Sequence, residues 1–214
     1  MKKSQKTIFT CQACGHQVPK WMGKCPECGG WDTLVEETQT SKPFQSTGPG
    51  LPATQTQPVP IDSVDIGEEY RIKTDIKEFD RVLGGGIVTG SLVLIGGDPG
   101  IGKSTLMLQA LYGLAKNSHK VLYVSGEESI QQIRIRSKRL GAVSSDLFVV
   151  SEIDVDAILT MMESEKPDVL VVDSIQTMFN SDLTSAPGSV SQVRESAVRL
   201  MLAAKKSGIP IFLV

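Results

Sequence analysis

The sequence lacks any long hydrophobic run and any strong excess of one charge. No apolar stretch in its 214 residues reaches the roughly 18 that a membrane-spanning helix needs. The basic start Met1-Lys2-Lys3-Ser4 is not followed by an apolar stretch, so we expect no secretory signal, a cytoplasmic location and no membrane partner. The formal net charge of −2 provides no general attraction to nucleic acid, so DNA binding would need a local patch or regions outside this chain.

Cysteine is also scarce, and all four cysteines lie between Cys11 and Cys28. They form two Cys-x2-Cys knuckles, and each knuckle can present two thiolates on one tight turn. Since a reducing compartment disfavours disulfides, the spacing predicts a structural Zn²⁺ site whose ligands are Cys11, Cys14, Cys25 and Cys28. A redox-active pair and a set of free thiols remain the alternatives.

One histidine and two tryptophans lie close to the cysteines in the sequence. We expect His16 to stay outside the ligand set, because four thiolates already complete a tetrahedral site. Trp31 is expected to cover the small core of this module. Trp21, with Lys20 and Lys24 nearby, either packs there as well or stacks on a nucleic-acid base.

Composition divides the chain into three zones. Residues 1–35 hold the cysteines and both tryptophans, and we expect them to form a small zinc-ribbon module. Residues 36–64 are rich in Thr, Gln, Ser, Pro and Gly and have too little apolar material to pack, which predicts a flexible linker. Residues 65–214 alternate apolar strands with helical patterns, which predicts an α/β core with a mainly parallel sheet.

Periodicity within the third zone predicts individual elements. The expected strands are 92–95, 121–124, 147–150, 169–172 and 209–214, and the expected helices are 103–115, 129–140, 155–165 and 192–207. The sequence stops inside the apolar segment 209–214 without a cap or a turn, and we therefore expect further sequence to follow.

One segment carries the strongest chemical signal. Gly97-Asp98-Pro99-Gly100-Ile101-Gly102-Lys103-Ser104 matches the P-loop pattern G-x4-G-K-[ST] and lies between an expected strand and an expected helix. Its glycines let backbone amides approach phosphates, and the helix N-terminus adds partial positive charge. Lys103 is expected to bridge the β- and γ-phosphates, and the Ser104 hydroxyl to ligate Mg²⁺. The pattern predicts an ATP site that also includes Thr105.

Carboxylates that could complete this site follow two other expected strands. Asp173 ends the apolar strand 169–172, as a Walker B aspartate that orients Mg²⁺ does, although an Asp at this position could instead cap a turn. The next residue is Ser174, so no glutamate for water activation follows directly. Glu127 and Glu128 lie just past the strand 121–124, where ligands gather in parallel sheets. We favour Glu127 over Glu128 as the general base. Glu128 could instead complement the dipole of the next helix, and both residues could serve only to cap that helix.

These segments, in this order, resemble the bacterial RadA (Sms) family of DNA repair ATPases in the RecA-like superfamily. The resemblance covers nearly the whole chain. It rests on the P-loop and on Trp21-Met22-Gly23-Lys24-Cys25-Pro26, Phe79-Asp80-Arg81-Val82-Leu83-Gly84-Gly85-Gly86, Ser125-Gly126-Glu127-Glu128-Ser129 and Val171-Val172-Asp173-Ser174-Ile175-Gln176-Thr177.

The resemblance implies a RecA-like core in a ring-forming, DNA-stimulated ATPase that promotes branch migration during homologous recombination. It implies that Glu127 is the general base, that residues 178–190 form a DNA-binding loop, and that the last strand lies between the P-loop strand and the Walker B strand. Single-stranded and branched DNA and a recombinase are the expected partners. A glycine is expected where Asp75 stands, and the family's polar sensor, Lys-Asn-Arg-Phe-Gly motif and C-terminal domain would follow Val214.

Two other functions remain open on the sequence. One is a signalling ATPase of the RecA fold, which can also carry paired glutamates after that strand. The other is a nucleotide-binding zinc module without motor activity.

Overall fold

The computed structural model describes residues 6–39, 58–63, 70–183 and 185–214. Most of the expected linker and the expected boundary at residue 65 lie outside the described residues. Within the segment 58–63, one short 3-10 turn, η1 (Ile61–Ser63), is present. None of the helices in the described part of the chain combines the length and hydropathy required to cross a bilayer.

The N-terminal segment folds as a three-stranded antiparallel ribbon. Its strands are β1 (Lys6–Cys11), β2 (Gln17–Val18) and β3 (Leu34–Gln39), in the order β2-β1-β3. β3 continues past the expected module boundary at residue 35, because β1 pairs with it along its whole length, up to Lys6 opposite Gln39. The ribbon has a core of its own, made of Cys11, Val18, Cys25 and Leu34 with Phe9 packed against them.

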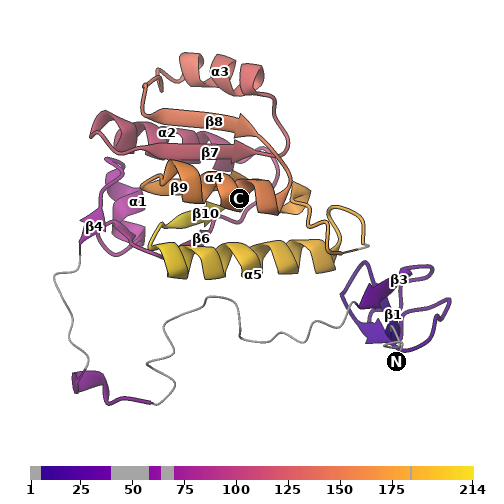
Figure 1. The fold of residues 1–214 in the computed structure, drawn as a ribbon. Helices are drawn as coiled ribbons and strands as arrows, with labels where there is room; N and C mark the ends of the chain where they lie inside the picture. Colours follow the sequence, from indigo (N-terminus) through magenta and orange to yellow (C-terminus); the bar gives the residue numbers. More distant parts are fainter. Residues whose placement is uncertain (1–5, 40–57, 64–69, 184) are drawn as a thin grey trace.

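A five-stranded parallel sheet forms the centre of the larger domain, and its strand order is β6-β10-β9-β7-β8 (Figure 1). The strands are β6 (Leu92–Leu94), β7 (Val121–Ser125), β8 (Leu147–Ser151), β9 (Val169–Asp173) and β10 (Ile211–Leu213). β10 inserts between the P-loop strand β6 and the strand β9, as the resemblance implied. The predicted α/β fold with a mainly parallel sheet is confirmed.

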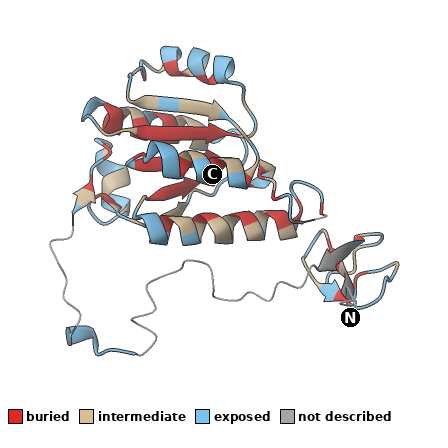
Figure 2. Cartoon of the chain, in the orientation of Figure 1, coloured by how far each residue is buried: buried red, intermediate tan, exposed pale blue. Residues whose placement is uncertain are grey.

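Helices cover both faces of this sheet, so its central strands are buried on both sides (Figure 2). In β9, Val169 and Val171 pack toward α2 (Lys103–Lys116), while Leu170 and Val172 pack toward α4 (Val155–Glu165) and α5 (Val190–Ser207). α3 (Ile130–Arg139) lies on the α2 side, over the edge strand β8.

Periodicity located the long elements within a few residues, and α4 has the predicted bounds. The short elements were not predicted from the sequence. They are α1 (Lys77–Val82), the 3-10 turn η2 (Ile175–Thr177), and the antiparallel pair of β4 (Arg71–Ile72) with β5 (Ile87–Val88). Segments this short carry too few residues to display a period.

Candidate nucleotide and zinc sites

The four cysteine sulfurs of the ribbon lie together, and none forms a disulfide. All four Sγ atoms lie within 4.8 Å of one another, and the pairs Cys11–Cys28 and Cys14–Cys25 are each separated by 3.7 Å. A tetrahedral Zn²⁺ with Zn–S bonds of about 2.3 Å places its sulfurs about 3.8 Å apart. The donor set and its spacing therefore fit zinc. The Thr33 hydroxyl, 3.2 Å from Cys11 Sγ, is placed to hydrogen-bond to that ligand.

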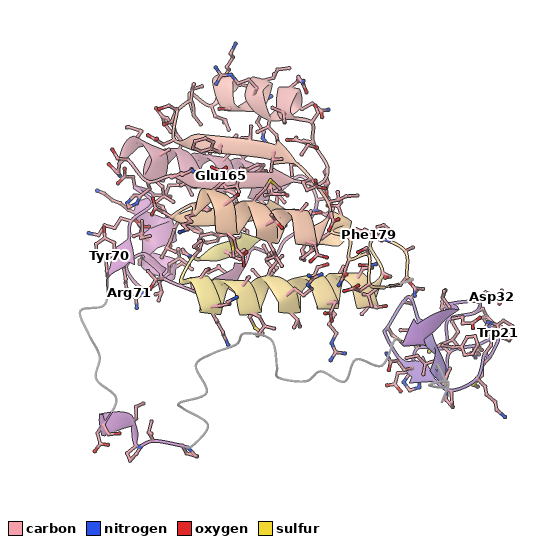
Figure 3. The ribbon with its side chains drawn as sticks, in the orientation of Figure 1. Trp21, Asp32, Tyr70, Arg71, Glu165 and Phe179 are labelled. Atoms are coloured by element: carbon pink, nitrogen blue, oxygen red, sulfur yellow. The ribbon has the colours of Figure 1, made fainter. Side chains whose placement is uncertain are left out.

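The ribbon does not bury its tryptophans. Trp31 is 71% exposed and Trp21 is 57% exposed, and Figure 3 shows Trp21 at the surface of the ribbon. The expectation that Trp31 covers the core is wrong, because the sulfur cluster and small aliphatic residues already fill this core. The Trp31 ring instead lies beside Lys24, whose Nζ is 5.6 Å from the ring centroid. His16 is outside the sulfur cluster, as expected, and its carbonyl accepts a hydrogen bond from the Cys11 amide.

The P-loop connects the end of β6 to the start of α2. Gly102 caps α2 with φ = 103°, in the left-handed region, and a Cβ on this residue would meet no atom within 4 Å. Glycine adopts this conformation without strain, so the loop can turn directly into the first turn of α2. Lys103 Nζ donates to the carbonyls of Gly97 and Asp98, at 2.7 and 3.0 Å, so its ammonium group is held over the same loop. Ser104 and Thr105 follow in the first turn of α2.

Asp173 is the last residue of β9, and its side chain is almost fully buried. It lies opposite Ser125 in the register with β7, at the carboxyl edge of the sheet. The Tyr123 hydroxyl donates a hydrogen bond to Asp173 Oδ2. Burial, together with the neighbouring Asp173 carboxylate, raises the pKa of Tyr123 well above its usual range, and Arg136 partly offsets this. The phenol therefore remains a hydrogen-bond donor.

The two glutamates after β7 have different partners. Glu127 is exposed, and its Oε1 accepts a 2.6 Å hydrogen bond from Ser174 Oγ, directly after Asp173. Glu128 forms an ion pair with Arg136, whose Nη1 lies 3.0 Å from Glu128 Oε1. One carboxylate therefore faces the residue after Asp173, and the other is neutralised by α3.

Gly126 explains why the chain can bring Glu127 to this position. A Cβ at Gly126 would overlap Thr177 Oγ1 and lie 2.9 Å from Met178 Cε. Its amide donates to the Asp173 carbonyl at 2.8 Å, which ties the end of β7 to the end of β9. Only glycine allows these two segments to approach so closely.

The segment 178–190 is anchored to α5 by one fully buried side chain, Gln192. Its Oε1 accepts from the Asn180 amide at 2.8 Å, and its Nε2 donates to the carbonyls of Asn180 and Ser185 at 3.2 and 2.9 Å. Phe179, labelled in Figure 3, forms a further bridge to Asp154. The exposed residues between these anchors include Ser181, Asp182 and residues 186–188.

Asp75, where a glycine was expected, has φ = +66°. This left-handed conformation is one that glycine adopts without strain. The aspartate is accommodated because its Oδ2 accepts from Asn117 Nδ2 at 2.9 Å.

Sequence reasoning missed several polar side chains around the site: Tyr123, Arg136, Ser174 as a donor to Glu127, and Gln192. Tyr123 carried one usable signal, since it is the only polar side chain among residues 121–124 of an otherwise apolar buried strand. The other three side chains have partners on other elements. Because these partners are distant in the sequence, no local pattern predicts the contacts.

Two family models match the chain. The KaiC ATPase model matches residues 72–165, and a rubredoxin metal-binding domain matches residues 9–36. Three bacterial relatives are each named DNA repair protein RadA. They come from Bacillus subtilis (54% identical over 211 residues), Halalkalibacterium halodurans (49% over 215) and Listeria monocytogenes (48% over 217). These alignments cover 98%, 98% and 100% of the chain but 46% of each relative, so the chain spans about half their length. Over the span that it shares with these relatives, the chain belongs to the RadA family of DNA repair proteins.

Proposed function

We propose that the protein is a DNA-stimulated ATPase that acts in homologous recombination and DNA repair and promotes branch migration. The observation that carries this proposal is the 2.6 Å hydrogen bond from Ser174 Oγ to Glu127 Oε1. It holds a carboxylate at Ser174, directly after Asp173, although no glutamate follows Asp173 in the sequence. The names of the relatives, which are DNA repair proteins, support the DNA part of the proposal.

The ATP phosphates would bind along Gly97–Ser104, where backbone amides and the N-terminus of α2 meet negative charge. Lys103 would leave the loop carbonyls that it now contacts and pair with the β- and γ-phosphates. Ser104 and Asp173 would hold Mg²⁺, which supplies neutralisation of the phosphate charge when it is bound with ATP. This donor set, one hydroxyl and one buried carboxylate, fits a hard cation that retains several waters.

Glu127 is the residue proposed to activate the attacking water. Its second carboxylate oxygen is free of the Ser174 contact and would accept a proton from the attacking water. Glu128 is less suited to this role, because its Oε1 is engaged by Arg136 Nη1 at 3.0 Å.

We propose that DNA contacts the segment 178–190. This segment contains no Lys or Arg and one aspartate, so it would bind through backbone amides and hydroxyl groups such as that of Ser181. Positive charge would come from nearby Arg194, which is exposed on α5.

Ring assembly, a recombinase partner and a cytoplasmic location are proposed from the resemblance to the RadA family. We also propose that the zinc-ribbon module and the ATPase core are separate domains joined by residues of the expected linker. Trp21 is exposed next to Lys20, which supports a contact with a base or a partner protein over a packing role.

A signalling ATPase of the RecA fold is the second candidate, because the KaiC ATPase model matches residues 72–165. The zinc ribbon and the relatives that match nearly the whole chain favour the first proposal. A Lys103→Ala variant with unchanged nucleotide affinity and turnover would instead favour a zinc module without motor activity.

ATP turnover by the full-length protein with and without single-stranded DNA tests the proposal. We expect DNA to raise turnover, and Glu127→Gln to lower kcat by about 100-fold or more while ATP still binds. The matched control is Glu163→Gln on the exposed surface of α4, which should leave turnover unchanged. Equal rates with and without DNA would favour the signalling ATPase, and loss of turnover in Glu128→Gln but not in Glu127→Gln would overturn the choice of base.

A further inference from the structure

Hydrogen bonds connect Glu128, Arg136 and Tyr123 in series, and the series ends at Asp173. Arg136, on α3, donates through Nη1 to Glu128 Oε1 at 3.0 Å and through Nη2 to the Tyr123 hydroxyl at 2.9 Å. Tyr123 in turn donates to Asp173 Oδ2. We refer to Tyr123, Arg136 and Glu128 as the positioning chain.

The direction of each proton in this chain follows from its donors. A guanidinium group has only donors, so the Tyr123 oxygen must accept from Arg136. The single phenolic proton then points to Asp173, which is the other neighbour of the hydroxyl. Asp173 Oδ2 is thereby committed to Tyr123, and Oδ1 is the oxygen left for a ligand.

Burial makes this arrangement specific. Tyr123 is fully buried, Asp173 is 7% exposed, and the Arg136 side chain is 14% exposed. In such surroundings hydrogen bonds are strong and an unpaired charge is costly, so Arg136 compensates the two carboxylates at the ends of the chain.

Packing alone does not account for the hydroxyl of Tyr123. The ring packs in the core with residues of α2, β7 and β9, and a phenylalanine would fill the same space. The oxygen adds only the link between Arg136 and Asp173. Because β7 and β9 are neighbours in register, with Tyr123 opposite Val171, the hydroxyl reaches Asp173 from the adjacent strand.

We propose that the positioning chain fixes the rotation of the Asp173 carboxylate and leaves Oδ1 as the oxygen that would bind the Mg²⁺ accompanying ATP. This assigns a role to Glu128 that differs from that of Glu127: Glu128 holds Arg136, and Arg136 orients the Tyr123 hydroxyl. The proposal rests on the proposed ATP site, but it requires neither DNA nor turnover.

Equilibrium binding of a fluorescent, non-hydrolysable ATP analogue to the full-length protein, titrated with Mg²⁺, tests the proposal. We expect Tyr123→Phe to raise the Mg²⁺ concentration at the midpoint by about 10-fold and to leave the metal-free affinity for the analogue unchanged. Tyr112→Phe removes a hydroxyl from α2, outside the positioning chain, and should leave the midpoint at its original value.

Arg136→Lys provides a second variant if Tyr123→Phe impairs folding. It keeps the positive charge but loses the planar fork that reaches Tyr123 and Glu128 together, so the Mg²⁺ midpoint should also rise. If Arg136 acts through Tyr123, a variant carrying both Tyr123→Phe and Arg136→Lys should have the same Mg²⁺ midpoint as Tyr123→Phe alone. The two shifts in midpoint should not add.

A purely structural role would lower the melting temperature and leave the Mg²⁺ midpoint unchanged, and that result would overturn the proposal. Additive shifts in the double variant would overturn the order of the chain. Equal turnover with and without DNA would overturn the proposed function and leave this proposal standing, because binding is measured without DNA.

Discussion

Ser174 occupies the position after Asp173, where many P-loop ATPases carry a glutamate, and its hydroxyl donates to Glu127. The serine is buried, and its contact orients a glutamate that belongs to a different strand end. In the proposed mechanism, two residues would share a task that a single residue performs in other P-loop ATPases. The residue after Asp173 therefore remains part of the site, although it cannot act as a base itself.

Ser174→Ala should lower kcat by about 10-fold, because Glu127 loses the donor that holds its Oε1. ATP affinity should stay unchanged, since Ser174 is not among the residues proposed to bind phosphate. Single-turnover kinetics alongside equilibrium nucleotide binding would separate the two effects. Ser151→Ala, at the exposed end of β8, is the matched control, and a kcat equal to that of the unsubstituted protein would contradict the prediction for Ser174.

At the scale of elements, the connection between η2 and α5 is held at its base by Gln192 and exposed in its middle. Three backbone groups of the connection bond to one side-chain amide. Asn180 and Ser185 are both fastened to the same point on α5, so motion in the described part of the connection would be confined to exposed residues such as Ser181, Asp182 and residues 186–188.

Gln192→Leu should release this connection, because a leucine fills similar space but leaves the Asn180 amide and the Ser185 carbonyl without their partner. The expected loss of stability is about 2 kcal/mol, and the connection should become sensitive to protease. Chymotrypsin suits the measurement, since Phe179 and Leu183 are potential cleavage sites and residues 178–190 contain no Lys or Arg for trypsin. Gln131→Leu, on the exposed face of α3, should not increase cleavage, and equal resistance in both variants would refute the anchoring role.

At the scale of the whole molecule, the ribbon and the ATPase core have separate hydrophobic clusters. The ribbon cluster contains four buried residues, two of which are cysteines, and is too small to fold without a metal. Both tryptophans of the sequence lie in the ribbon, so tryptophan fluorescence reports on this module alone. The ATPase core has a two-sided sheet and does not depend on the sulfur cluster for its packing.

Purified protein should contain about one zinc per chain, as four thiolates define one tetrahedral site. Replacing Cys25 and Cys28 by serine should remove the zinc and change the tryptophan emission, while ATP affinity stays the same. Metal analysis, fluorescence and nucleotide binding on the same sample would check all three. A freshly reduced sample without metal would contradict the zinc site. A loss of ATP binding together with the zinc would contradict the independence of the ATPase core from the ribbon.

Sequence reasoning reached the sheet, the P-loop, Asp173 and the four cysteines, since each lies in a short segment with its own pattern. The central place of β10 followed only from the family resemblance, because periodicity finds strands but does not order them. The exposure of Trp31 and the contacts of Arg136 could not be predicted. Both depend on which side chains the tertiary fold brings together. The sulfur cluster fills the ribbon core and leaves Trp31 outside it, and the Tyr123 hydroxyl of β7 lies within reach of Arg136.

The position of β10 has a consequence for synthesis of the protein on the ribosome. In the described sheet, β6 pairs only with β10, and β10 pairs with β9 on its other side. Until residues 211–213 have emerged, the P-loop strand has no partner that joins it to the strand ending in Asp173. A nascent chain can therefore form the β9-β7-β8 part of the sheet early, but the pocket for ATP assembles only when this late strand is inserted.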